Sequence, residues 1–165
     1  MPAGGTYEPI ATTTISGTST TTVAFTSIPS TYTDLILVTN ITTTNNSNGN
    51  GWITFNNDTG TNYSQTRIYG GTGVGGSDRQ TGTNYLNLNI GGFNNGILSI
   101  CQIMNYSNST TYKGVITRIN NLSQYVGQNI GMWRNANAIS RIDVTIHEGY
   151  MNAGSTITLY GITAA

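Results

Sequence analysis

Stretches in which apolar and polar residues alternate constrain the fold of this chain more than any other feature of its sequence. In residues 140–148 the apolar side chains occupy every second position, at Ile142, Val144 and Ile146. Successive side chains of a β-strand point to opposite faces of a sheet. This period of two therefore predicts a strand whose apolar residues face a core, while Asp143 and the other polar residues face outward.

Further segments of this kind follow one another along the chain, separated by clusters of Gly, Asn, Ser and Asp that are typical of turns. None of them has the period of a helix. The pattern predicts an all-β protein, an antiparallel β-sandwich of roughly eight to ten strands. The segments expected to supply these strands are residues 21–25, 34–41, 52–55, 64–69, 85–90, 97–106, 112–120, 126–134, 140–148 and 156–162, and residues 7–16 could add an extended first strand.

Two segments lead to more specific expectations. Residues 34–41 are almost continuously apolar, which predicts a central strand that is covered on both faces. Residues 70–83 contain six Gly and are expected to form the longest loop. In the strand predicted after this loop, Leu86, Leu88 and Ile90 are expected to face one way.

The balance of charges restricts the partners of the chain. Its 165 residues include six Lys and Arg and six Asp and Glu, so the formal net charge is zero. Because binding to a nucleic-acid backbone needs clustered cations, no nucleic-acid partner is expected. No apolar run is long enough to cross a bilayer, so no membrane partner is expected either. We assign residues 11–165 to a single β-sandwich domain and residues 1–10 to an N-terminal arm.

The residues that most often carry catalysis are few. His147 is the sole His, and the sole Cys, Cys101, lies in an apolar run that predicts a buried thiol. Asp58 and Asp78 could form the carboxylate pair of a glycosidase, although Asp58 lies in a turn signature and is favoured as a turn cap. The sequence shows no motif for a metal or a phosphate group. We therefore predict no catalytic residue, no metal site and no cofactor.

Aromatic side chains offer another kind of site, because they can stack on sugar rings. They can equally belong to the core or to a subunit interface, and this second interpretation is favoured. The residues concerned are Trp52, Tyr63, Tyr69, Tyr85 and Trp133.

Four stretches spread over most of the chain carry a family resemblance. They read ATTT followed by VAFTSIPSTYTDL, then FNNDTGTNYS, then GMWR followed by AI, and finally AGSTITLYGI. In this order and spacing they resemble small virion proteins of tailed bacteriophages, particularly phages of cyanobacteria and other aquatic hosts. The resemblance implies a jelly-roll-like β-sandwich that is often trimeric, and it brings no catalytic residue with it.

The resemblance leads to two hypotheses for function. Since the chain has no heptads or repeats that could form a fibre shaft, the preferred one is a capsid decoration (cement) protein. It would bind the outer surface of the phage head as a homotrimer, through the major capsid protein or other virion proteins. The alternative is a short fibre or tail receptor-binding (adhesin) module that recognises host glycan. Both hypotheses place the protein in the virion, assembled in the host cytoplasm.

The candidate contact residues for these partners come from two places. Tyr7, Pro9 and Ile10 lie in the predicted arm, and the entropy lost in ordering an arm is recovered only on a partner surface. Trp133 is added because aromatic residues are enriched in interfaces.

Overall fold

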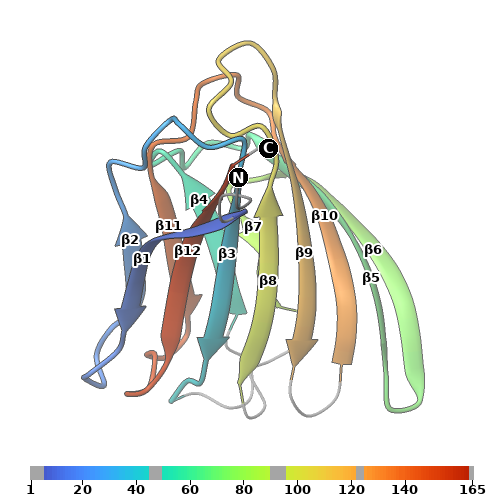
Figure 1. The fold of residues 1–165 in the computed structure, drawn as a ribbon. Helices are drawn as coiled ribbons and strands as arrows, with labels where there is room; N and C mark the ends of the chain where they lie inside the picture. Colours follow the sequence, from blue (N-terminus) through green and yellow to red (C-terminus); the bar gives the residue numbers. More distant parts are fainter. Residues whose placement is uncertain (1–5, 45–49, 90–95, 122–124, 164–165) are drawn as a thin grey trace.

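The computed structural model describes residues 6–44, 50–89, 96–121 and 125–163, and within these ranges it contains strands and no helix (Figure 1). The prediction of an all-β antiparallel protein is confirmed, with more strands than expected. The strands are β1 (Tyr7–Thr14), β2 (Thr22–Phe25), β3 (Asp34–Ile41), β4 (Asn50–Phe55), β5 (Tyr63–Gly71), β6 (Val74–Thr83), β7 (Leu86–Asn87), β8 (Ile97–Ile103), β9 (Lys113–Asn121), β10 (Tyr125–Trp133), β11 (Ile142–His147) and β12 (Thr156–Ile162).

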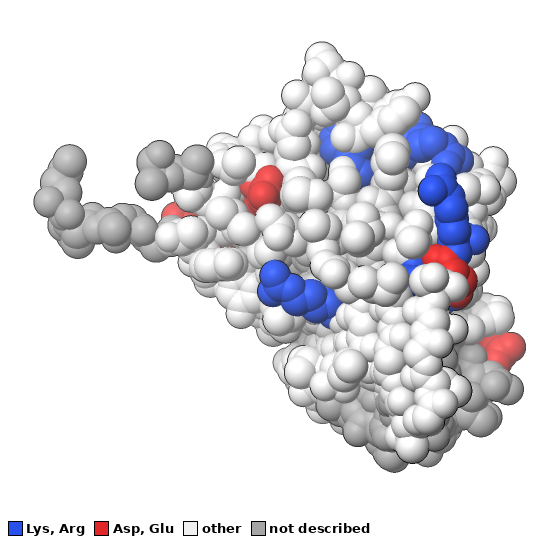
Figure 2. Space-filling view, turned by 90° about the vertical axis from the view of Figure 1, so that its right-hand side faces the viewer, with Lys and Arg blue, Asp and Glu red and all other residues white. Residues whose placement is uncertain are grey.

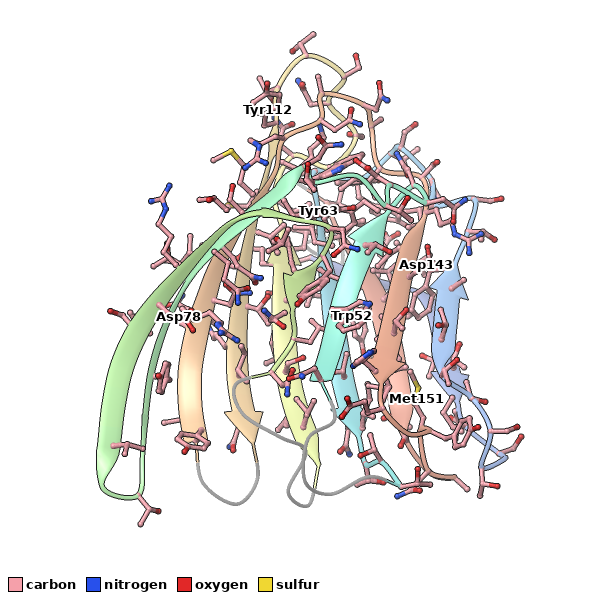
Figure 3. All side chains as sticks on the ribbon, turned by 180° about the vertical axis from the view of Figure 1, so that it is seen from behind. Trp52, Tyr63, Asp78, Tyr112, Asp143 and Met151 are labelled. Carbon is pink, nitrogen blue, oxygen red and sulfur yellow. The ribbon has the colours of Figure 1, made fainter. Side chains whose placement is uncertain are left out.

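The strands form two antiparallel sheets. The large sheet has eight strands in the order β1-β12-β3-β8-β9-β10-β5-β6, and the small sheet has four in the order β2-β11-β4-β7. Figure 1 shows the large sheet in front, and Figure 3 shows the small sheet from behind. Together they form a sandwich with the core between them.

Four antiparallel strand pairs are nested in the sequence. β1 pairs with β12, β2 with β11, β3 with β8, and β4 with β7. Successive pairs alternate between the large and the small sheet. The chain is therefore arranged like one long hairpin wound into two sheets. The remaining strands β5, β6, β9 and β10 extend the large sheet beyond β8.

The core is formed by every second residue of the strands that line it. Leu35 and Leu37 of β3 and Val144 of β11 are each 0% exposed. The alternation predicted for residues 140–148 is confirmed in β11. Asp143 lies on the opposite side of β11 from Val144, but it is shielded from solvent by Arg141, whose Nη2 lies 2.6 Å from its Oδ1.

Charged groups are sparse on the side shown in Figure 2. Lys and Arg form a band along one edge of this view, with acidic atoms beside it, and most of the remaining surface carries neither Lys or Arg nor Asp or Glu. Lys113 is fully buried, and its Nζ donates to the carbonyl oxygens of Thr111 (2.6 Å) and Ala136 (3.0 Å). The surface is thus dominated by hydroxyl, amide and apolar groups.

The prediction of a long loop at residues 70–83 is wrong, because β5 and β6 form a hairpin there. Its turn contains Gly73 with a φ of +74°, a conformation that glycine adopts without steric cost. Asp78 of β6 accepts a 2.8 Å hydrogen bond from Nε of Arg67 on β5. Polar cross-strand pairs of this kind stabilise a strand that has almost no apolar residues.

The strand predicted at residues 85–90 is much shorter, since only Leu86–Asn87 form β7. Leu86 and Leu88 are both buried, whereas Ile90 lies outside the described residues. The backbone N–H of Asn87 donates 2.9 Å to Oε1 of Gln65 on β5. A side chain of the large sheet therefore satisfies the edge of the small one.

Residues 7–10, assigned from the sequence to an arm, belong instead to the large sheet. They begin β1, which pairs with β12 and forms one edge of that sheet. Pro9 is tolerated because an edge strand has one side without sheet partners, and the register shifts between Pro9 and Ala11. Residues 1–5 of the predicted arm lie outside the described residues.

Candidate interaction surface

The outer face of the large sheet is apolar, and no layer formed by the described residues covers it. Outward faces of antiparallel sheets normally carry polar side chains. Here Ile100 is 39% exposed, Ile130 52% and Val126 59%. We call "outer face" the outward-pointing side of this sheet, on which Asn40, Ser64, Thr66, Arg79 and Asn120 are polar. Its central residues are Ile36, Val38, Ile68, Leu98, Ile100, Gln102, Ile116, Arg118, Val126, Gln128, Ile130 and Met132.

Strand β3 shows how the sequence pattern produced this surface. Leu35 and Leu37 point into the core, while Ile36 and Val38 lie on the outer face. The prediction that residues 34–41 are covered on both faces holds for Ile36, which is 8% exposed, and is corrected for Val38 and Asn40, which are partly and fully exposed. The apolar run reflects one face against the core and a second face over which the described residues form no further layer.

The register of the strands arranges the outer face in rows. One row crosses five strands through Val38, Ile100, Arg118, Gln128 and Ile68. Side chains directly opposite each other in such rows have Cβ atoms about 4.5–5.5 Å apart, so they form a continuous surface. The neighbouring row runs through Tyr160, Ile36, Gln102, Ile116 and Ile130.

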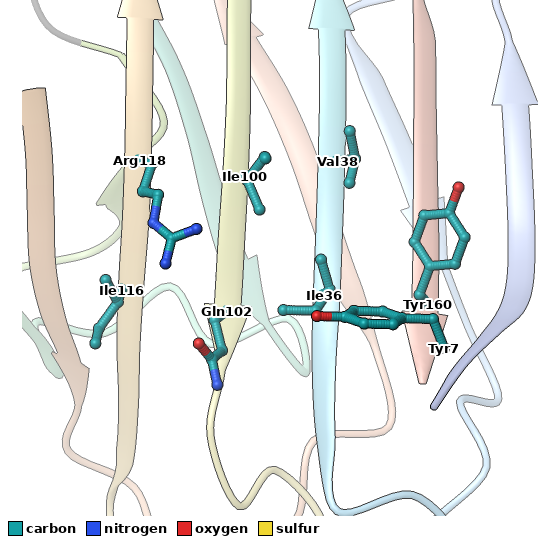
Figure 4. A pocket seen from close by; sticks show the side chains of 8 residues that line it. All are labelled: Tyr7, Ile36, Val38, Ile100, Gln102, Ile116, Arg118 and Tyr160. Atoms are coloured by element: carbon teal, nitrogen blue, oxygen red, sulfur yellow. The ribbon is translucent and has the colours of Figure 1, made fainter. Parts of the chain in front are cut away.

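Part of this surface is hollowed between β12 and β9. The hollow has a volume of about 420 Å³, and Figure 4 shows Arg118 on one side of it and Tyr7 and Tyr160 on the other. We call it the Arg118 hollow; it is lined by Tyr7, Ile36, Val38, Ile100, Gln102, Ile116, Arg118 and Tyr160. A second hollow of about 420 Å³ shares Ile100 and Arg118 with it and continues toward β10.

Arg118 has no hydrogen-bonding or ion-pair partner within the described part of the chain. By contrast, Arg67 on β5 is engaged by Asp78, and Arg141 is engaged by Asp143. The carboxylate of Asp34, near the end of the outer face, accepts hydrogen bonds from Nε2 of Gln102 (3.2 Å) and from a backbone N–H. The Arg118 hollow therefore combines an apolar wall with one uncompensated positive charge.

Of the four residues predicted to contact partners, two are exposed and two face the core. Tyr7 is 60% exposed and lines the Arg118 hollow, and Pro9 is exposed on β1. Ile10 packs against the core from the same strand. Trp133 is 0% exposed and packs against Phe55, so its assignment to an interface is corrected. Its position on β10 turns it inward, toward the small sheet.

The two carboxylates considered for a glycosidase do not face each other. Asp58 lies in the turn after β4 and accepts hydrogen bonds from the backbone N–H of Gly60 (2.9 Å) and the indole of Trp133 (2.7 Å). Asp78 is bound to Arg67, further along the sheet. Asp58 is thus a turn-capping residue, as favoured from the sequence. Within the described ranges no group of three His, Cys, Asp or Glu side chains could hold a metal ion.

The aromatic residues singled out from the sequence lie in three places. Tyr69 is half-buried on β5 of the large sheet, where its ring meets that of Tyr125 edge-on. Tyr63 and Trp133 are fully buried. Trp52, labelled in Figure 3, is half-buried on β4. Its ring stacks with those of Tyr85 and His147, at centroid distances of 4.5 Å and 5.1 Å. His147 is exposed, and its Nδ1 lies 4.0 Å from a carboxylate oxygen of the neighbouring glutamate. This aromatic row was not anticipated, because sequence alone does not bring residues of three segments together.

Comparison with known proteins gives no family: no family model matches the chain, and no curated protein matches it. No helix among the described residues is long and apolar enough to span a membrane. The outer face is the feature that sequence reasoning missed. Its signal lay in the apolar residues on both sides of β3 and at Ile100, Ile116 and Ile130.

Proposed function

We propose that the protein is a structural component of a bacteriophage virion, a capsid decoration protein that binds the outer surface of the head as a homotrimer. The uncovered apolar outer face is the observation that carries this proposal. Large exposed apolar patches mark interaction sites, because leaving them in water is unfavourable. A rigid sandwich with one such face is suited to being fixed to another protein surface. The four stretches that resemble virion proteins point the same way.

The strand connections support the jelly-roll part of the proposal. We infer a jelly roll from the nested pairs β1/β12, β2/β11, β3/β8 and β4/β7, which place four strands of the long hairpin in each sheet. In this description β9 and β10 and the hairpin β5–β6 are insertions. They widen the large sheet and contribute Ile116, Ile130 and Val126 to the outer face.

The number of copies per particle tests the proposal. Purified virions are analysed by quantitative gel staining, with the shell protein as internal standard. A decoration protein is expected at a copy number comparable to that of the shell protein. A few copies per particle would favour a tail location, and absence from the particle would contradict the proposal. The mass of the purified protein, measured by light scattering, tests the homotrimer separately.

The aromatic row of Trp52, Tyr85 and His147 favours a second candidate, an adhesin that binds host glycan at the tail. Trp52 and Tyr85 are half-buried and stack on each other at the small sheet, away from the outer face of the large sheet. If they bind sugar, Trp52→Ala should abolish retention on immobilised host polysaccharide. Tyr112→Ala is the matched control, since Tyr112 is 57% exposed and makes no ring contact within the described residues. Equal retention of both variants and the wild type would reject this candidate.

A further inference from the structure

We propose that the Arg118 hollow binds a segment of a different virion protein in which a carboxylate is flanked by aliphatic side chains. This inference rests on the proposed function, which it deepens by naming the chemistry of the partner. It follows from two properties of the hollow that point to the same occupant: its apolar wall and its unpaired guanidinium.

The apolar wall selects the flanking side chains of the occupant. Ile36, Val38, Ile100 and Ile116 present aliphatic groups around the hollow (Figure 4). An occupant that covers them removes apolar surface from water at both partners, which is the main driving force of protein association. Aliphatic side chains of the partner fit such a surface, whereas a hydrated polar segment would not displace its water.

The guanidinium selects the carboxylate. Arg118 stands opposite Ile100 on β8 and Gln128 on β10, so its strand neighbours offer no negative charge. A partner without an anion would cover this cation and leave it unpaired, which is unfavourable. A carboxylate forms charge-assisted hydrogen bonds with a guanidinium, often two in parallel. Charge complementarity therefore requires an acidic residue within the apolar segment.

A second copy of the chain does not fit the hollow in a face-to-face contact. Such a contact would bring the Arg118 groups of two outer faces together, and the other unpaired arginine of this face, Arg79, adds a further positive charge. Four of the described carboxylates are already engaged within the chain, those of Asp34, Asp58, Asp78 and Asp143. Of the other two, Glu8 follows Tyr7 on β1 and points to the other side of the large sheet, and Glu148 follows β11 of the small sheet, so a face-to-face contact offers neither. The occupant is therefore a different protein, and self-association through this face becomes an outcome of the test.

The binding chemistry can be tested on the purified protein with defined probes. The probe is a blocked peptide of sequence Ser-Ile-Glu-Leu-Ser, and its matched control has Gln in place of Glu. Binding is followed by NMR of the isoleucine methyl groups. We expect the methyl signals of Ile36, Ile100 and Ile116 to shift, with the Glu peptide binding about tenfold more tightly than the Gln peptide, the ratio expected for one charge-assisted bond.

Two variants of the protein make this result specific. Arg118→Gln should remove the preference for the Glu peptide, whereas Arg79→Gln, on the same face but outside the hollow, should keep it. Equal binding of both peptides by the wild type, or shifts confined to methyl groups elsewhere, would overturn the proposal. So would a change of oligomeric state in Arg118→Gln by sedimentation velocity, because the face would then be a contact between copies.

The outcomes also separate this inference from the proposed function. If the Glu peptide is preferred but the protein is absent from virions, the proposed function fails and the chemistry of the hollow stands. If the protein is abundant in virions but shows no preference for the Glu peptide, the inference about the hollow fails alone.

Discussion

The indole Nε1 of Trp133 donates a 2.7 Å hydrogen bond to Oδ2 of Asp58, which ties the end of β10 to the turn after β4. The same carboxylate accepts from the backbone N–H of Gly60 and from Nδ2 of Asn62. The hydroxyl of Tyr63 completes the cluster, because it donates to the carbonyl oxygen of Asp58 at 3.2 Å and accepts from a backbone N–H of β4. Asp58 thus holds together two strands of the large sheet and one of the small sheet.

Removing this carboxylate should destabilise the fold. In Asp58→Ala the fully buried indole N–H of Trp133 loses its acceptor, and we expect the free energy of unfolding to fall by about 2–3 kcal/mol. Urea unfolding followed by tryptophan fluorescence measures the change. Asp58→Asn keeps an acceptor oxygen and should lose less. An Asp58→Ala variant as stable as the wild type would show that the cluster contributes nothing.

The carboxylates of Asp58 and Asp78 should make the free energy of unfolding depend on pH in the acid range. Partial burial opposes ionisation of Asp58, but hydrogen bonds from Asn62, Trp133, Gly60 and Asn135 outweigh it and lower its pKa below 3.8. At Asp78 the hydrogen bond from Arg67 lowers the pKa, and this effect exceeds the opposing effect of burial.

Since the pKa values of these two carboxyl groups are lower in the folded protein than in the unfolded chain, the unfolded chain binds protons at them more readily. The stabilisation is fully present above the ordinary value of 3.8 and is lost as the pH falls through the folded values. We therefore expect urea midpoints to drop steeply below about pH 4. The double variant Asp58→Asn, Asp78→Asn, although less stable near neutral pH, should show a shallower drop. An unchanged slope in the double variant would assign the acid sensitivity to other groups.

A glycine of β12 is needed for close packing. A Cβ added at Gly161 would lie 2.3 Å from the ring of Tyr32, and the glycine has no unusual backbone angle. We expect Gly161→Ala to cost about 1–3 kcal/mol, because the ring must move. Gly70→Ala is the matched control, as that strand glycine has open space around its Cβ position. If the cost arises from the ring, Gly161→Ala should be almost neutral in a Tyr32→Ala background.

The single cysteine should be unreactive in the native protein. Cys101 is 0% exposed in the core, and burial raises the pKa of its thiol to about 12. Because the thiolate is the reactive form, a disulfide reagent at about pH 8 should modify it only after unfolding in guanidinium. Thr22→Cys adds an exposed thiol that should react at once and serves as the positive control. Rapid native modification of Cys101 would contradict its burial.

Local alternation was sufficient to predict the strands that border the core. Residues 34–41 and 156–162 were predicted with the bounds that β3 and β12 have, because core packing imposes a regular pattern on them. Strand β6 was not predicted, because almost all of its residues are polar or Gly and show no apolar alternation. It forms by pairing with β5. Its stabilising contacts, such as Asp78 with Arg67, join residues of two strands and leave no periodic signal in either.

The candidate site could be predicted only in part, for a related reason. A continuous apolar run indicates that both faces of a strand are apolar. It does not indicate whether the layer that covers the outward face belongs to the same chain or to a partner. Ile36 and Val38 both lie on the outer face, where Ile36 is buried and Val38 is partly exposed. Trp133 was misplaced because an aromatic residue suits a core and an interface equally, and only the register with Tyr63 turns it inward.

Replacing outer-face residues by polar ones tests whether that face is free in the isolated protein. We expect the double variant Ile100→Thr, Ile130→Thr to change the free energy of unfolding by less than about 1 kcal/mol, because the two side chains are 39% and 52% exposed and Thr retains a high β-propensity. Ile53→Thr, at a position that is 0% exposed, should cost about 2–5 kcal/mol. Binding of a hydrophobic dye to the native protein should decrease only in the outer-face variant. A double variant as unstable as Ile53→Thr would show that these isoleucines are packed within the fold. It would contradict the assignment of the outer face as an interaction surface.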